Sequence, residues 1–234
     1  MKRQSSLEEI SDGRLYTAND MVRADCNGCK GCSSCCRDMG DSVILDPYDL
    51  FRLTAQAGFS FEELMNGKIE LHVVDGIILP SLSMANGACA FLNQEGRCTI
   101  HAHRPGICRL FPLGRYYGSN GPEPDPLSEK LSKERSFRYF LQIHECPMPN
   151  RTKIKVEKWI DTPQLRRYEA FICDWHYFLE DVQTRIAHET DDAAVKNINL
   201  FLLKLFFIRP YRPDADFYSQ FHDRMEQAKE VLEL

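Results

Sequence analysis

The sequence predicts an α+β protein: an irregular, cysteine-rich metal-binding module with small antiparallel hairpins and short helices, followed by a helical module. Three observations predict this arrangement. All 13 glycines lie at or before position 121, so the first half of the chain is rich in loops. Nine of the 10 cysteines fall between positions 26 and 146. Residues 151–234 repeat apolar residues at helical spacing.

We therefore divide the chain into an N-terminal arm at residues 1–25, a cysteine-cluster metal-binding domain at residues 26–150 and a helical module at residues 151–234. The length of 234 residues, with 43% hydrophobic and 27% charged residues, is that of an ordinary globular protein. The formal net charge of −5 argues against a general nucleic-acid or anionic-membrane binder.

The chain carries no sign of export or membrane insertion. The first twenty residues have no apolar run of the length that a secretory signal needs, so we expect a cytoplasmic protein. The longest apolar stretch, residues 199–208, is about half the length of a membrane crossing and includes Lys204. We predict that this stretch is a buried helix.

Two short helices are expected early in the cysteine-rich domain. The first begins at the Asp46-Pro47 pair and ends at Gly58, because proline is favoured at the first helical position and glycine just past the last. The second follows from Ser60 and Glu63, which form a capping box.

Strands are expected on both sides of turn signals. An Asp-Gly pair separates two apolar runs within residues 69–79, which is the strongest short hairpin signal. A second, looser hairpin is expected within residues 88–100, and it carries Cys89 and Cys98. A further strand is expected at residues 136–143.

The last module is predicted to be a helical hairpin or three-helix unit. From Leu165 to Ile186 apolar residues recur at steps of three and four, which indicates a one-faced amphipathic helix. Two more helices are expected near residues 192–208 and 215–234, the last with Asp214 as its N-cap. This module is a possible surface for a protein partner or a protein substrate.

A dense run of cysteines opens the metal-binding domain. Four of them, Cys26, Cys29, Cys32 and Cys36, have the x2, x2, x3 spacing of the bacterial ferredoxin run, with Arg37 in place of the usual proline. A run of this kind gathers several thiolates around one point, so it can hold a 4Fe–4S cluster. A tetrahedral zinc site needs only four such ligands, which the same run can also supply.

Further cysteines follow at long intervals. Because cytoplasmic cysteines are more often ligands or nucleophiles than disulfide partners, we take them as metal ligands. Two four-ligand centres use eight thiols, and this region has nine, so it can hold one or two centres. The later thiols meet only through the fold, which couples metal binding to folding. The candidate metal ligands are Cys26, Cys29, Cys32, Cys35, Cys36, Cys89, Cys98, Cys108 and Cys146.

The box Cys-x2-Cys-x2-Cys-Cys at positions 29–36, followed by CAFLNQEGRCTIHAHRPGICRLFP, resembles the CxxCxxCC cysteine-cluster family of zinc- or iron-chelating proteins. The matching elements are a cysteine before Phe-Leu, a Gly-x-Cys-x-Ile, the Arg-Pro-x-x-Cys-Arg-x-Phe-Pro of residues 104–112, and a late cysteine at position 146. The resemblance spans residues 26–146. It implies an iron–sulfur or zinc-binding domain, and related domains occur in bacterial flagellin lysine methylases.

Cationic and imidazole side chains accompany the later cysteines. His101 stands where such proteins often have tyrosine, so it is a candidate additional ligand. On a strand His101 and His103 would point to opposite faces, which leaves at most one for a given centre. Arg104 and Arg109 are predicted to bind the cofactor, because guanidinium groups stabilise an anionic thiolate centre. Cys173 is expected to be a small buried hydrophobic residue rather than a ligand.

We favour iron–sulfur over zinc, because structural zinc sites usually use paired Cys-x2-Cys knuckles that lie far apart in sequence. Nucleotide, dinucleotide and metalloprotease motifs do not occur in the sequence, and no catalytic residue is identified. Three roles stay open. They are a metal-cluster protein without an assigned reaction, a cluster-dependent protein-modifying enzyme of the lysine N-methylase type, and a zinc-stabilised protein-interaction module.

Overall fold

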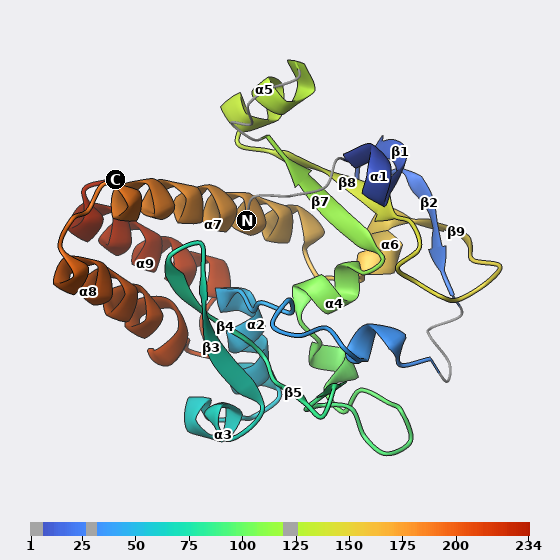
Figure 1. Cartoon of the computed structure of the whole chain (residues 1–234), viewed down its shortest axis with the longest axis horizontal. Helices are drawn as coiled ribbons and strands as arrows, with labels where there is room; N and C mark the ends of the chain where they lie inside the picture. Colours follow the sequence, from blue (N-terminus) through green and yellow to red (C-terminus); the bar gives the residue numbers. More distant parts are fainter. Residues whose placement is uncertain (1–6, 27–31, 119–125) are drawn as a thin grey trace. The chain divides into compact units, whose positions relative to one another are not determined.

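The computed structural model describes residues 7–26, 32–118 and 126–234, and it confirms the α+β prediction (Figure 1). Helices alternate with small antiparallel sheets, and the C-terminal region is helical. The chain divides into two compact units. Unit 1 comprises residues 36–108 and 178–234, and unit 2 comprises residues 2–35 and 109–177. The boundaries that we placed at residues 26 and 151 stay a prediction.

Unit 1 combines short hairpins with helices. Its elements are α2 (Pro47–Phe51), η3 (Arg52–Gln56), α3 (Phe61–Met65), β3 (Ile69–Val74), β4 (Ile77–Leu82), β5 (Met84–Ala85), β6 (Ala88–Cys89), η4 (His101–His103), α8 (Asp192–Leu203), η5 (Lys204–Ile208) and α9 (Phe217–Leu232). The part of α7 (Leu165–Ala187) that follows Tyr177 also belongs to it.

Both predicted short helices form, and each begins with a reciprocal capping box. Asp46 accepts a hydrogen bond from the backbone amide of Asp49, whose side chain accepts one from the Asp46 amide, at the start of α2. Ser60 and Glu63 do the same at the start of α3. Helix α2 continues into the π-helical η3 and ends before Gly58, which has φ +83° as predicted for a glycine past a helix.

The first predicted hairpin is confirmed, and the second forms only next to its turn, where an antiparallel bridge joins Leu92 to Cys98 and the Thr99 amide donates to the Phe91 carbonyl. Strands β3 and β4 are antiparallel around Asp75 and Gly76, which both have positive φ. Strand β6, with Cys89, pairs with β5 instead of the segment around Cys98. The reason is the turn at Asn86-Gly87, whose φ values of +52° and +73° suit a two-residue hairpin better than the longer turn does.

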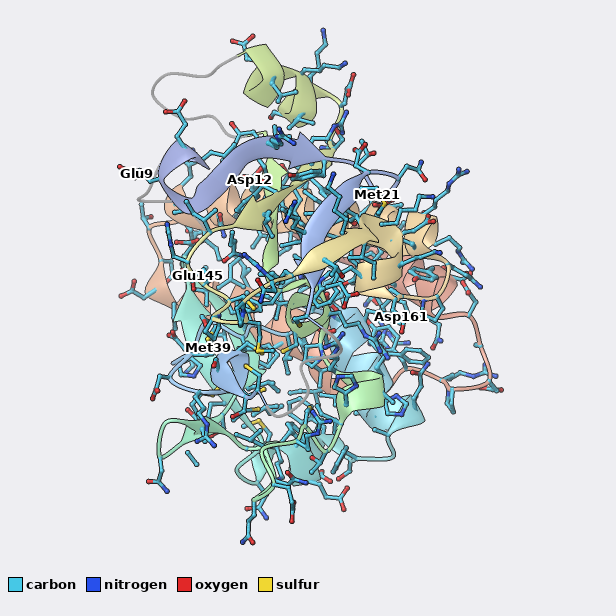
Figure 2. The ribbon with its side chains drawn as sticks, turned by 90° about the vertical axis from the view of Figure 1, so that its right-hand side faces the viewer. Glu9, Asp12, Met21, Met39, Glu145 and Asp161 are labelled. Carbon is cyan, nitrogen blue, oxygen red and sulfur yellow. The ribbon has the colours of Figure 1, made fainter. Side chains whose placement is uncertain are left out.

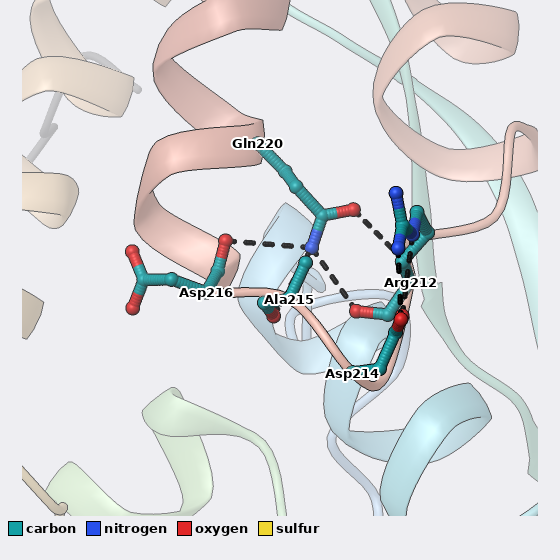
Figure 3. Close-up of polar contacts among 5 residues, drawn as sticks. All are labelled: Arg212, Asp214, Ala215, Asp216 and Gln220. Carbon is teal, nitrogen blue, oxygen red and sulfur yellow. Dashed lines mark hydrogen bonds and ion pairs between the residues drawn. The ribbon is translucent and has the colours of Figure 1, made fainter.

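The predicted N-cap of the last helix is also wrong. Asp216, not Asp214, caps α9, because its carboxylate accepts a hydrogen bond from the Ser219 amide at 2.9 Å. Figure 3 shows Asp216 at the start of the helix and Asp214 beside Arg212. Asp214 forms an ion pair with Arg212 at 2.8 Å. The Gln220 side chain closes this loop, since it accepts from the Arg212 amide and donates to the Arg212 carbonyl.

The core of unit 1 is built from aromatic rings. Tyr48 and Phe51 of α2 lie 4.9 and 5.2 Å from Phe217 of α9, measured between ring centroids. Phe206 lies 5.6 Å from Phe178 and is fully buried. The apolar stretch at residues 199–208 is helical as predicted, but only one face of it is buried, since Leu200, Lys204 and Ile208 are exposed. Within the described part of the chain, no helix combines the length and the apolar character that crossing a membrane requires.

A buried asparagine joins the β3–β4 hairpin to the helices of unit 1. Asn199 of α8 is 5% exposed. Its Oδ1 accepts from the Ile78 amide at 2.6 Å, and its Nδ2 donates to the carbonyls of Gly76 and Val195 at 3.0 and 3.1 Å. The side-chain amide of Asn199 thus bonds to backbone atoms of both elements, and it fixes where the hairpin turn lies on α8.

Unit 2 contains the remaining sheets. Its elements are α1 (Leu7–Ile10), β1 (Ser11–Tyr16), β2 (Met21–Asp25), β7 (Leu113–Tyr117), α5 (Pro126–Lys133), β8 (Phe137–Gln142), β9 (Thr152–Lys155), α6 (Val156–Ile160) and the first part of α7. Strands β1, β8 and β7 form one antiparallel sheet in that order, and β2 pairs with β9. Strand β8 confirms the strand predicted at residues 136–143.

A glycine in β7 makes room for an aromatic ring of β8. Gly114 lies directly opposite Phe140, which is 1% exposed. A Cβ atom at position 114 would lie 2.2 Å from Cζ of that ring. The close approach of the two strands therefore requires glycine at this position.

We expect Gly114→Ala to lower the free energy of unfolding by about 2–3 kcal/mol, because the added methyl group overpacks the site. Denaturant unfolding measures this change. The double variant Gly114→Ala/Phe140→Leu should recover part of the loss, since the smaller side chain relieves the clash. A single variant as stable as the parent would contradict the packing described here.

We expect Asn199→Ala to lower the free energy of unfolding by about 2–3 kcal/mol, because it leaves buried backbone groups of the hairpin turn without their partners. Asn197→Ala is the matched control, since Asn197 is an exposed residue of the same helix. Equal losses for the two variants would show that the buried amide does not hold the hairpin.

Candidate metal centre

The N-terminal cysteine run starts directly after β2. Cys26 is buried, with 6% of its surface exposed. Cys32 is half-buried, and its thiol donates to the Ser34 hydroxyl at 3.5 Å. Cys35 is half-buried in the single turn η2 (Ser34–Cys36). Cys29 lies outside the described residues.

The last cysteine of the run lies next to a cysteine of the later motif. Within unit 1 an antiparallel bridge joins Arg37 to Ala88. In an antiparallel pairing, the residue before one partner lies opposite the residue after the other partner. This step places the backbone of Cys36 beside that of Cys89, although the two residues are far apart in the sequence.

Gly87 permits this pairing. The Asp38 amide donates to the Gly87 carbonyl at 2.8 Å. Gly87 has φ +73°, and a Cβ atom there would lie 2.6 Å from the Asp38 carboxylate. A residue with a side chain would be strained at this φ, so glycine suits the turn that leads into the pairing of Cys36 with Cys89.

Cys98 lies at the end of a closed loop. An isolated bridge joins it to Leu92, and the Thr99 amide donates to the Phe91 carbonyl at 2.8 Å. Phe91 is 2% exposed and packs edge-on against Phe59 at 5.8 Å. The loop is thus fixed to the core of unit 1, and Cys98 itself is half-buried.

The segment after Cys98 corrects one expectation. His101 and His103 lie in the 3₁₀ turn η4 and not in a strand, as the hydrogen bond from the His103 amide to the Ile100 carbonyl indicates. Residues two apart in such a turn do not point to opposite faces, so the argument from strand alternation fails. His101 is exposed and His103 is half-buried.

Cys108 lies in α4 (Gly106–Leu110), whose first residue is held by a buried carboxylate. The Gly106 amide donates to Oδ1 of Asp49 at 2.8 Å. Arg52 donates through Nη2 to the Ala102 carbonyl. The sequence analysis missed both residues. The Asp-x-x-Asp pattern at the start of α2 was readable as a capping box, but a contact 57 residues away leaves no local signal.

Arg109, one of the two predicted cofactor-binding arginines, is buried in unit 2. Its Nη1 donates to the backbone carbonyl of Asp161 at 2.7 Å and lies 3.9 Å from the Asp161 carboxylate. Figure 2 labels Asp161, which ends α6 with a positive φ of 48°. Trp159 of the same helix donates to the carbonyls of Leu110 and Phe111. Helix α6 thus fixes the chain directly after Cys108.

Arg104, the other predicted cofactor-binding arginine, has a buried Nε. Among the described residues this Nε has no hydrogen-bond partner. A buried donor of this kind is expected to meet an acceptor. Arg104 lies between Cys98 and Cys108 in the sequence, so a thiolate or a sulfide ion would be a suitable acceptor for it.

The late cysteine lies in a connecting loop of unit 2. Cys146 is half-buried between β8 and β9, and it follows Glu145, which Figure 2 labels. The thiol of Cys146 is free.

The donor set fits a thiophilic metal by its chemistry, since thiolates bind both zinc and iron. In residues 7–26, 32–118 and 126–234, no three His, Cys, Asp or Glu side chains are grouped as a metal site requires. The described part of the chain also contains no disulfide bond between its cysteines. Four of the predicted ligands belong to unit 1, namely Cys36, Cys89, Cys98 and Cys108. Four others belong to the described part of unit 2, namely Cys26, Cys32, Cys35 and Cys146.

Cys173 differs from the predicted ligands. It is half-buried on α7, and burial raises the pKa of its thiol to about 12. Burial of this kind disfavours the thiolate form, which is the form that binds a metal. Cys173 lines a pocket of about 360 Å³ in unit 2, beside Glu169, which accepts a hydrogen bond from the Tyr139 hydroxyl at 2.9 Å. The described residues around this pocket include none of the predicted ligands.

No curated protein and no solved structure matches the chain significantly. A family comparison does find a match, over residues 28–137. The matched segment includes seven of the nine predicted ligand positions, while Cys26 and Cys146 lie outside it. Residues 28–137 of this chain match the model of the CxxCxxCC family, described as a "Putative zinc- or iron-chelating domain".

Proposed function

We propose that this protein binds one or two iron–sulfur clusters through its cysteines, with 4Fe–4S as the cluster type. The observation that carries the proposal is the pairing that brings Cys36 next to Cys89 in unit 1. It places the last cysteine of the run beside a cysteine of the later motif, so cysteines from two distant stretches of sequence are neighbours within unit 1. Metal binding of the coarser kind, to zinc or iron, follows from the family.

The choice of an iron–sulfur cluster over zinc rests on the ligand pattern. The x2, x2, x3 spacing of the run is that of ferredoxins, in which four thiolates surround a cubane. Structural zinc sites use four ligands, commonly as two separate knuckles. Nine thiols in this arrangement favour the cluster, and they leave one thiol beyond two complete sets.

The arginines support an anionic centre. The buried Nε of Arg104 is a donor directed into the protein, and among the described residues it finds no acceptor. Hydrogen bonds from such groups to sulfur stabilise a cluster and tune its potential. Arg109 is the less direct candidate, because its Nη1 already donates to Asp161.

Protein purified without oxygen tests the metal assignment. We expect iron and acid-labile sulfide in about equal amounts, roughly four of each per cluster, together with visible absorbance from thiolate-to-iron charge transfer. Elemental analysis, sulfide assay and absorption spectroscopy measure these quantities. Zinc alone, or iron without sulfide, would overturn the iron–sulfur proposal and favour a zinc-stabilised module.

Cysteine variants test the ligand set. We expect Cys36→Ser and Cys89→Ser each to lower the bound metal per chain and the thermal stability, because a lost thiolate weakens a site that is coupled to folding. Cys173→Ser is the matched control. It should leave the metal content unchanged, since the described residues around the pocket that Cys173 lines include none of the predicted ligands.

Two outcomes would contradict this division of the cysteines. One is a loss of metal from Cys173→Ser. The other is a full complement of metal in both Cys36→Ser and Cys89→Ser, which would separate the two residues from the metal site.

A further inference from the structure

Two charged side chains are buried side by side along the helix that begins at α2. Asp49 is 2% exposed and Arg52 is 6% exposed. Both make hydrogen bonds to the backbone of the same distant segment, residues 102–106. Asp49 accepts from the Gly106 amide at 2.8 Å, and Arg52 donates to the Ala102 carbonyl. We call this pair of contacts the 49/52 clamp.

The clamp is specific in its geometry. A carboxylate or guanidinium taken out of water is costly unless it is paired, so these contacts are needed for the groups to be buried at all. Hydrogen bonds with one charged partner are also the stronger kind. Asp49 accepts a second hydrogen bond, from the Asp46 amide at 3.2 Å, which fixes its carboxylate at the start of α2.

The helix that carries the 49/52 clamp packs against the aromatic core of unit 1. Tyr48 and Phe51, the neighbours of Asp49 in α2, pack against Phe217 at centroid distances of 4.9 and 5.2 Å. Arg52 lies with its guanidinium carbon 5.9 Å from the centre of the Tyr48 ring. The two charged groups are therefore held by the aromatic core of unit 1.

The clamped segment is the connection between two predicted ligands. Ala102 is four residues after Cys98, and Gly106 is two residues before Cys108. With both ends of residues 102–106 fixed, the start of α4 has a defined place in unit 1, and so does the backbone of Cys108. The side chains that do this are not ligands themselves.

We propose that Asp49 and Arg52 are positioning residues that set the place of Cys108 before metal binds. This inference rests on the proposed function, because it takes Cys108 as a ligand. The clamp reduces the backbone freedom that metal binding would otherwise have to remove, so it raises the affinity of the site. It also predicts that the segment is ordered in the metal-free protein.

The test compares Asp49→Ala with Ser60→Ala in the full-length chain. Ser60→Ala also removes a capping box in unit 1, at α3, where the hydrogen bonds of Ser60 join it to Glu63. Asp49→Asn is the milder variant, which keeps the size of the side chain and removes its charge. Hydrogen exchange of the metal-free protein, followed by peptide mass spectrometry, reports on residues 102–108.

We expect the amides of residues 102–108 to exchange about tenfold faster in Asp49→Ala than in Ser60→Ala, from the loss of one charge-assisted hydrogen bond. Affinity for the metal found in the purified protein, measured by chelator competition, should fall by about 10-fold to 100-fold. Asp49→Asn should change both in the same direction, which keeps the test valid if Asp49→Ala does not fold.

The failure of the clamp is distinguishable from the failure of the proposed function. If the parent protein binds metal and the Asp49 variants match Ser60→Ala in exchange and affinity, the clamp is overturned and the metal site stands. If the parent binds no metal, both are overturned, whatever the exchange shows. Faster exchange without any change in affinity also overturns the positioning role.

Discussion

The buried carboxylate of Asp49 is the interaction on which the candidate site of unit 1 depends. It completes the capping box of α2 and holds the first amide of α4, so one side chain sets two helix starts that are far apart in the sequence. A buried charge is stable only where its partners are fixed. The aromatic contacts of Tyr48 and Phe51 supply that fixed base. The cysteine motif of unit 1 is thus supported by the packing of aromatic side chains.

The cysteine-rich segments need this support because they have little regular structure of their own. Cys36 lies at the end of one 3₁₀ turn, Cys89 in a two-residue strand and Cys98 at an isolated bridge. Elements this short do not persist alone in water. Their places are fixed by close backbone contacts, such as that of Gly87 with Asp38, and by anchors such as Phe91. A bound metal would add to the same network.

The helical and sheet elements outside the motif make a different contribution. In unit 1, Asn199 joins a hairpin turn to α8 through two hydrogen bonds. In unit 2, Gly114 lets β7 approach the buried ring of Phe140. Each is a single residue whose chemistry suits one backbone geometry. An asparagine and a glycine therefore join these elements, and none of the predicted cysteine ligands takes part in these two contacts.

The sequence by itself determined the features that local chemistry fixes. These are the α+β class, the helix start at Asp46-Pro47, the capping box at Ser60, the Asp-Gly hairpin, and a family resemblance carried by cysteine spacing. The sequence-based predictions of the last N-cap at Asp214 and of the partner of the strand that carries Cys89 were wrong. In both places neighbouring turn signals compete, and local propensity does not rank them. Only the tertiary structure decided that Asp49 reaches Gly106 and that Cys36 lies by Cys89. The reason is physical: contacts between distant residues depend on how whole elements pack, and no single stretch of sequence records that packing.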